Sequence, residues 1–251
     1  MRARLGEGAW IFGRPATNLS SMTNLYAEEL SLTRRDSPEG YGRGWIFLLR
    51  HRRMTTLYHV PRTRSTRPRW LLEELGVPYE LIRLDPTKGE TRTDAHAQRH
   101  PLKHVPVLET KDGPLFESAA LVLQLADQHG RLLPAVGTYE RGLVYQWAFF
   151  VMTELEPHCA VYFFEKVRKR TPESPLALDA KGTINEAARA LDSYFVGREW
   201  LLPSGFSAGD VIVGAVSWWA NRMGGIENAP NLLAYIQRCE ARPAYQRAHA
   251  D

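Results

Sequence analysis

Residues 100–127 constrain the fold more than any other part of the chain, because several local signals follow one another there in a fixed order. Val105-Pro106 precedes a short apolar run, Val107-Leu108, that is typical of a strand. Proline cannot donate to a ladder, so it belongs at the first strand position or at an edge. Residues 111–114 contain Asp-Gly, which predicts a hairpin turn because glycine adopts positive φ without steric cost. Leu115-Phe116 is then the returning strand.

The end of this stretch predicts a helix. Ser118 stands directly before the apolar run 119–126, and Gly130 is the expected C-cap. The N-terminus of a helix presents unpaired N–H groups, and together with a hydroxyl it can bind a carboxylate. The start of this helix is therefore a candidate anion site.

The preceding segment has the pattern of a strand, a helix and a second strand. Residues 55–59 predict the first strand, 69–75 a helix ended by Gly76, and 79–84 the second strand. Such a crossover makes the two strands parallel and right-handed. With a short helix near 93–99 and the hairpin and helix above, residues 54–130 are expected to form a thioredoxin-like domain.

The rest of the chain has helical patterns throughout, and we expect an all-helical domain over residues 137–249. Residues 139–170 predict a long helix with a kink at Pro157. The other helices are expected at 182–196, 206–220, 230–239 and 243–249. Ser207 and Asp210 have the spacing of a capping box at the start of the central, buried helix.

These segments together resemble the glutathione transferase family. HPLKHVPVLE, a DG turn and FESAALVLQLAD are similar to the second half of its N-terminal domain, and LLP followed by FSAGD is similar to a helix start in its second domain. The resemblance covers residues 54 to about 248. It implies an α/β plus all-α fold, with a thioredoxin-like glutathione-binding domain followed by the all-helical domain.

The resemblance also implies roles for particular residues. The backbone of Val105 would pair with the cysteinyl part of glutathione, and the Val105-Pro106 bond would be cis. Glu117 and Ser118 would hold the γ-glutamyl end. Lys103 and His104 flank this strand, and Lys103 would reach the glycyl carboxylate unless both are simply solvated loop residues.

The loop after the first strand is where the resemblance places thiol activation. HVPRTRSTR, residues 59–67, resembles the S-R-S-x-R form of bacterial transferases, with Thr63 in place of the activating serine and Ser65 as a reserve donor. Helix capping is the alternative role of both hydroxyls. Arg64 stands where other members carry a cysteine, so thiol-disulfide chemistry by a protein cysteine is not expected. Tyr58 is expected to be packed.

A hydrophobic, electrophilic second substrate is expected between the sheet and the long helix. The candidate lining residues all lie on that helix: Tyr145, Phe149, Met152 and Tyr162. The pattern does not separate those that line a pocket from those in the core.

The formal net charge of +4 is confined to the start of the chain. Residues 1–53 contain nine basic and five acidic residues, and the remainder contains 23 of each. We expect residues 1–53 to be an N-terminal extension that is disordered or a start-site artefact, and we expect no nucleic-acid partner. The alternative is a basic arm that contacts acidic surfaces or nucleic acid.

Other classes of protein are disfavoured by composition. Cys159 and Cys239 are far apart and in no CxxC pair, which favours a reduced, cytoplasmic protein. No apolar run approaches the roughly 18 residues of a membrane span. The eight histidines show no metal-ligand spacing, so no metal is expected. The resemblance implies glutathione as the co-substrate.

The resemblance thus implies a cytoplasmic, homodimeric detoxification enzyme. It would conjugate the glutathione thiolate to a small hydrophobic electrophile, with glutathione peroxidase activity as a variant. A non-catalytic binding or regulatory protein with the same fold is the alternative, because fold is a poor guide to activity.

Overall fold

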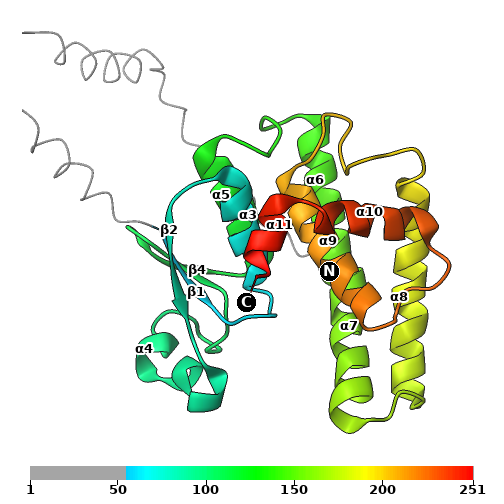
Figure 1. Cartoon of the computed structure of the whole chain (residues 1–251), viewed down its shortest axis with the longest axis horizontal. Helices are drawn as coiled ribbons and strands as arrows, with labels where there is room; N and C mark the ends of the chain where they lie inside the picture. Colours follow the sequence, from blue (N-terminus) through cyan, green and yellow to red (C-terminus); the bar gives the residue numbers. More distant parts are fainter. Residues whose placement is uncertain (1–54, 251) are drawn as a thin grey trace, which may run out of the picture. The chain divides into compact units, whose positions relative to one another are not determined.

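The computed structural model describes residues 55–250, which belong to the compact unit Arg53–Asp251. The expectation for residues 1–53 lies outside the described residues. We call residues 55–130 the sheet half and residues 137–249 the helical half (Figure 1). The sheet half is thioredoxin-like and the helical half consists of helices and loops with one isolated β-bridge, between Leu202 and Gly205, so the predicted fold class is confirmed.

The sheet has four strands in the order β2-β1-β3-β4. They are β1 Thr55–His59, β2 Tyr79–Arg83, β3 Val107–Thr110 and β4 Gly113–Phe116. β1 pairs with β2 in parallel, while β3 is antiparallel to both β1 and β4. The predicted parallel crossover is therefore confirmed.

The hairpin between β3 and β4 is tighter than expected. Thr110 pairs with Gly113, so only Lys111 and Asp112 connect the strands, and Gly113 has the expected positive φ of 129°. Pro114 is part of β4 and not of the turn. Because β4 is an edge strand, the missing N–H of this proline costs no ladder bond.

Two helices of the sheet half, α3 (Thr66–Leu75) and α5 (Ser118–His129), pack against each other. α3 begins three residues before its predicted start, because Pro68 is accommodated in the first helical turn and does not exclude it. Both helices end at the predicted left-handed glycines, Gly76 and Gly130. Between β2 and β3 lie two 3₁₀ turns, Pro86–Lys88 and Glu90–Arg92, and the short α4, Asp94–Ala97.

The long helix of the helical half is interrupted as expected near Pro157. It consists of α6 (Tyr139–Phe150), a π-helical turn (Val151–Leu155), α7 (Glu156–Phe163) and a second π-helical turn (Phe164–Lys169). In the first π turn the N–H of Glu156 bonds to the carbonyl of Val151, five residues earlier. Pro157 has no N–H to continue the α-helical ladder, so the wide turn directly before it is the local accommodation.

α8 spans Pro175–Tyr194, so its predicted start at residue 182 is wrong by seven residues. The start is set by Ser174, whose hydroxyl accepts from the N–H of Ala177 at 3.2 Å, and by Pro175 at the first helical position. These are local start signals that an apolar period alone does not reveal.

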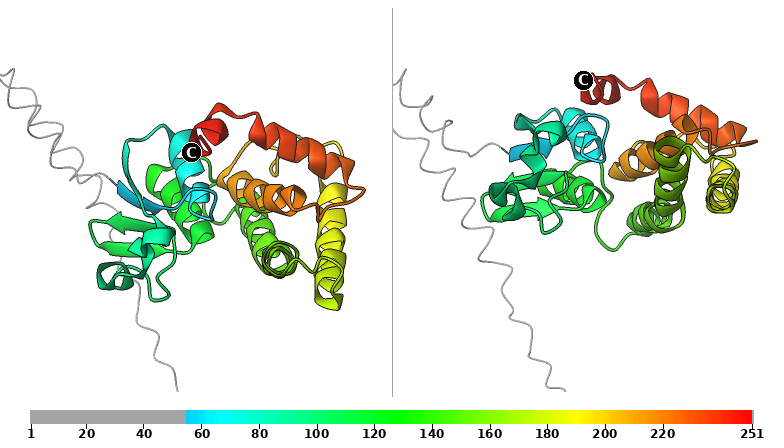
Figure 2. Two further views of the ribbon diagram at one scale, coloured as in Figure 1. Left: turned by 60° about the horizontal axis from the view of Figure 1, so that its bottom comes forward. Right: turned by 90° about the horizontal axis from the view of Figure 1, so that it is seen from below.

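The predicted central helix, α9 (Ala208–Arg222), contacts both halves of the molecule. Figures 1 and 2 show it between the long helix and α10 (Pro230–Glu240), and it also touches α3 and α5. The capping box at its start is present. Gly214 permits close packing, because a Cβ there would lie 2.8 Å from Cys239 Sγ.

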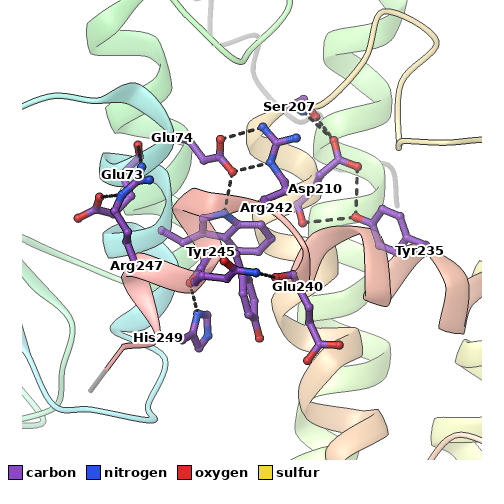
Figure 3. A network of polar contacts seen from close by, with 12 residues as sticks. Glu73, Glu74, Ser207, Asp210, Tyr235, Glu240, Arg242, Tyr245, Arg247 and His249 are labelled. Atoms are coloured by element: carbon purple, nitrogen blue, oxygen red, sulfur yellow. Dashed lines mark hydrogen bonds and ion pairs between the residues drawn. The ribbon is translucent and has the colours of Figure 1, made fainter.

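The last helix, α11 (Pro243–Ala248), returns to the sheet half and packs on α3 (Figure 2). Arg242 donates to both carboxylate oxygens of Glu74 at 2.6 and 2.8 Å, and Arg247 donates to Glu73 at 2.7 Å (Figure 3). Two ion pairs therefore join the C-terminal segment to α3. No helix within residues 55–250 combines the length and apolar character needed to cross a membrane.

Candidate functional site

A cavity of about 530 Å³ lies where the loops of the sheet half meet the long helix. Its wall includes seven of the eight residues that sequence reasoning selected: Thr63, Lys103, His104, Val105, Pro106, Glu117 and Ser118. The eighth, Ser65, is fully buried and is not part of the wall. The position and the hydrogen bonds of each residue determine which part of a ligand it could bind.

Val105 is available for pairing with an extended ligand. The Val105-Pro106 bond is cis, as expected, and β3 begins only at Val107. Within residues 55–250, neither the N–H nor the carbonyl of Val105 has a backbone hydrogen bond. An extended ligand here would find one donor and one acceptor, as at a sheet edge.

Glu117 and Ser118 form the N-terminus of α5. Glu117 has φ of 73°, an uncommon conformation for a residue with a side chain, and such local strain concentrates at functional sites. Ser118 is 3% exposed, and its hydroxyl accepts from Nη1 of Arg67 at 3.1 Å. Because the guanidinium uses an acceptor position of this hydroxyl, its proton remains for an anionic ligand.

Thr63 and Ser65 are hydrogen-bonded to each other, with 2.8 Å between Oγ1 and Oγ. The Thr63 hydroxyl donates to the carbonyl of Val60 at 2.7 Å. Thr63 is an exposed residue of the cavity wall. Ser65 lies behind it and contacts the N–H and carbonyl of Val60 and Nδ1 of His59, at 3.1, 3.0 and 2.8 Å. Ser65 precedes α3 without capping it through its side chain, so the capping alternative is not observed for this residue.

A buried ion-pair cluster joins the two halves beside the cavity. Nη1 of Arg67 lies 2.8 Å from Oε2 of Glu156, and these side chains are 5% and 4% exposed. Arg64, half exposed, bonds to the other carboxylate oxygen and lies over the ring of Trp219. Burial alone would raise the pKa of Glu156, but the two guanidinium groups outweigh it and hold that pKa below its ordinary value.

The loop that carries Lys103 and His104 is braced by two further histidines. Nε2 of His96 lies 2.9 Å from the carbonyl of His104, and Nδ1 of His100 accepts from the N–H of Leu102 at 3.1 Å. Burial, together with the neighbouring His104, lowers the pKa of His100. The ammonium of Lys103 donates to the carbonyl of Arg92 at 2.9 Å, so it would have to exchange this bond to reach a ligand.

The expected second-substrate residues are mostly elsewhere. Met152 is on the cavity wall. Tyr162 is 5% exposed and belongs to the core, while Tyr145 and Phe149 are exposed residues of α6 outside the wall. Three of the four side chains therefore lie on other faces of the long helix. Tyr58 is buried, as predicted.

Sequence reasoning missed His59, His100 and Glu156 as parts of the site. His100 carried a usable signal, since it opens the loop before the proline strand. Glu156 lies 89 residues from Arg67 and carries no local signal of their pairing. Among residues 55–250, no group of three or more His, Cys, Asp or Glu side chains is arranged to hold a metal ion.

Comparison with known proteins gives consistent matches over both halves. Residues 54–126 match the model described as glutathione S-transferase, N-terminal domain, and residues 143–243 match glutathione S-transferase, C-terminal domain. A glutathione transferase family member from Pseudomonas fluorescens Pf-5, solved with two glutathione bound, has a TM-score of 0.70 and 26% identity, covering 78% of this chain and 92% of that chain.

Two curated relatives match over shorter segments. Glutathione S-transferase 4 of Zea mays is 37% identical over 87 residues, which are 34% of this chain and 39% of the relative. Elongation factor 1-gamma of Trypanosoma cruzi is 30% identical over 129 residues, which are 51% of this chain and 30% of the relative. The chain thus spans well under half of the length of either relative.

Proposed function

Because the chain belongs to the glutathione S-transferase family, we propose that it transfers glutathione to a small hydrophobic electrophile. The observation that carries the proposal is the composition of one cavity wall. It combines the unpaired backbone of Val105, the buried hydroxyl of Ser118 and the hydroxyl of the exposed residue Thr63. These groups complement the cysteinyl backbone, a carboxylate and the thiol of glutathione, in that order.

The cavity wall also suits the charges of glutathione. Arg64 and Lys103 contribute positive charge, and Glu117 and Glu156 contribute negative charge. Glutathione carries two carboxylates and one ammonium group. We assign the γ-glutamyl carboxylate to Ser118 at the N-terminus of α5, where N–H groups and the helix dipole favour an anion. Lys103 and His104 are assigned to the glycyl end.

Thiol activation sets the energetic requirement. A thiol with a pKa near 8.5 is only about 3% ionised at pH 7, and lowering its pKa by ~2 units requires about 2.7 kcal/mol of differential stabilisation. A hydroxyl that donates to the thiolate supplies on the order of 1.5 kcal/mol. We propose that Thr63 is this donor. The Thr63 hydroxyl now donates to the carbonyl of Val60. It must give up this hydrogen bond before it can donate to the sulfur.

The reaction then follows from the thiolate. The sulfur attacks an electrophilic carbon to form a carbon–sulfur bond, and the displaced electron pair goes to the leaving group or, in an addition, to the acceptor atom. In the peroxidase variant the thiolate reduces a hydroperoxide to an alcohol, and a second glutathione completes the disulfide with release of water. Met152 is the apolar side chain of the cavity wall assigned to the second substrate.

The test combines glutathione affinity with the ultraviolet absorbance of the bound thiolate as a function of pH. Thr63→Val removes only the hydroxyl, while Thr63→Ser restores it and is the matched control. The wild type and Thr63→Ser should show a bound thiol pKa of about 6 to 7, and Thr63→Val should raise it. Ser118→Ala should weaken binding. An unshifted thiol in the wild type, or an unchanged one in Thr63→Val, would refute the assignment.

A non-catalytic binding or regulatory role is the second candidate. Two observations favour it: the Thr63 hydroxyl is already bonded to Val60, and a curated relative carries the name elongation factor 1-gamma and not that of a transferase. Glutathione binding with an unshifted thiol and no turnover of a panel of electrophiles would support this role.

We also propose a cytoplasmic homodimer. Large apolar side chains are exposed on α6 and around β4 and the loop before β3, including Phe149, Leu102 and Phe116 at 65%, 69% and 39%. Such side chains are suited to an interface between two copies. Cys159 and Cys239 are both buried thiols without a disulfide, in keeping with a reducing compartment.

A further inference from the structure

A row of hydrogen bonds runs from the cavity wall into the interior behind Thr63. Oγ1 of Thr63 lies 2.8 Å from Oγ of Ser65, which lies 2.8 Å from Nδ1 of His59. Ser65 and His59 are both 0% exposed. On the far side of the imidazole, Nη1 of Arg69 lies 3.5 Å from Nε2. We call Thr63, Ser65 and His59 the Thr63 network.

The two hydroxyls of the Thr63 network share one acceptor, the carbonyl of Val60. The carbonyl of Val60 lies 2.7 Å from Oγ1 of Thr63 and 3.0 Å from Oγ of Ser65, and each hydroxyl has one proton to give. The position of the His59 proton decides the outcome. If Nδ1 is bare, it accepts the Ser65 proton, and the Val60 carbonyl is left to Thr63. The Thr63 proton is then used within the protein.

The other tautomer reverses this arrangement. If Nδ1 carries a proton, it donates to Ser65, whose oxygen also accepts from the N–H of Val60 at 3.1 Å. The Ser65 proton then goes to the carbonyl of Val60, which no longer requires the proton of Thr63. Oγ1 of Thr63 keeps an internal donor in the N–H of Ser65 at 3.3 Å. The Thr63 proton becomes available to a sulfur in the cavity.

We propose that His59 is a positioning residue that acts through Ser65 to direct the hydroxyl proton of Thr63 into the cavity. This inference rests on the proposed function, since it names what orients the donor to the thiolate. The neighbouring guanidinium allows the required tautomer. An arginine can only donate, so this 3.5 Å contact with Nε2 is compatible with a ring whose Nε2 is bare and whose Nδ1 is protonated.

The proposal is tested with two replacements of His59. His59→Asn keeps an amide N–H close to the position of Nδ1, whereas His59→Leu removes the donor. In His59→Leu the thiolate-to-thiol ratio of bound glutathione should fall about fivefold, as expected for the loss of one hydrogen bond of about 1 kcal/mol. His59→Asn should restore most of it. In a Thr63→Val background, His59→Leu should have no further effect.

Two results would overturn the proposal: an unchanged thiolate ratio in a folded His59→Leu variant, or the same loss with and without the Thr63 hydroxyl. A purely structural role of His59 would lower stability without this dependence on Thr63. Melting curves of all variants separate the two effects.

A measurement on the unaltered protein covers the case in which His59 variants do not fold. Nuclear magnetic resonance of nitrogen-15-labelled histidine, without glutathione, reports which ring nitrogen of His59 carries the proton. The proposal requires a proton on Nδ1 of His59, and a ring whose Nδ1 is bare would overturn it. Failure of the wild type to bind glutathione would instead refute the proposed function, so the two failures are distinguishable.

Discussion

The Glu156→Gln substitution removes the negative charge that pairs with Arg67 while keeping the size of the side chain. The pair joins α3 of the sheet half to α7 of the helical half, with 2.8 Å between Nη1 and Oε2. After the substitution, Arg67 remains buried, and its partners in the helical half are a neutral amide and the sulfur of Met152. Arg64 is half exposed, so water can solvate its guanidinium after the substitution. Most of the loss in folding stability therefore comes from Arg67.

The size of the effect follows from burial. Both partners are about 95% buried, with side-chain exposures of 5% and 4%, and leaving one member of a buried ion pair without its partner typically costs about 3 to 5 kcal/mol. The glutamine carbonyl still accepts one hydrogen bond from Arg67, so we expect about 3 kcal/mol at pH 7. Arg67 also donates to Ser118, so glutathione affinity should fall as well.

The loss should depend on pH. The pKa of Glu156 is held below its ordinary value in the folded protein, so its stabilisation is complete above the unfolded value of about 4.3. It is lost as pH falls through the lower, folded pKa. The stability difference between wild type and Glu156→Gln should therefore be constant near neutral pH and shrink in acid.

Urea unfolding followed by tryptophan fluorescence measures this difference. Glu154→Gln is the matched control, because Glu154 lies two residues away on the same long helix and is exposed. It should change stability by less than about 0.5 kcal/mol. A loss below about 1 kcal/mol in Glu156→Gln, or a loss that persists unchanged in acid, would refute the reasoning from a buried charge pair.

Three further outcomes are expected. Asp210→Asn should cost about 1 to 3 kcal/mol in urea unfolding, because one amide oxygen replaces a carboxylate that accepts four hydrogen bonds. The exposed Asp179→Asn is its control, and equal losses would contradict the account. The ring of His100 should titrate below about 6.5 by nuclear magnetic resonance, since burial and a neighbouring imidazole lower its pKa. Its contribution to stability is then complete above that value and declines on acidification; a raised pKa would contradict this. Leu102→Glu and Phe149→Glu should each convert a dimer to monomers in sedimentation velocity if those exposed side chains form the interface, and an unchanged mass would exclude them.

The fold was predictable because its signals are local. Each strand of the sheet is a segment of four or five residues that includes apolar side chains. The helices α3 and α5 end at glycines that adopt the left-handed conformation. The errors are of the same local kind. The predicted start of α8 was wrong because the apolar spacing was given more weight than the start signal Ser174-Pro175. The predicted hairpin turn was too long because it included Pro114, which lies in the edge strand β4.

The candidate site could be predicted only for residues that lie in a short local sequence motif. The backbone of Val105, the hydroxyl of Ser118 and the hydroxyl of Thr63 each lie in a short motif with its own pattern. The second-substrate residues were not predictable, because all faces of the long helix carry large apolar side chains. Tyr162 faces the core and Phe149 faces solvent, and helical spacing does not determine which face meets the cavity.

The groups that we propose for glutathione binding and for thiol activation depend on different parts of the molecule. The hydroxyl of Ser118 is held by Arg67, and Arg67 by Glu156, so the carboxylate subsite depends on contact between the two halves. The hydroxyl of Thr63 contacts the carbonyl of Val60 and the hydroxyl of Ser65, and Ser65 contacts His59, all within the sheet half. Among the hydrogen bonds described for residues 55–250, none joins a side chain of one set to a side chain of the other. Loosening the contact between the halves should therefore weaken the proposed capture of glutathione while Thr63, the proposed donor to its sulfur, stays in place, because coupling between groups requires a shared contact or network.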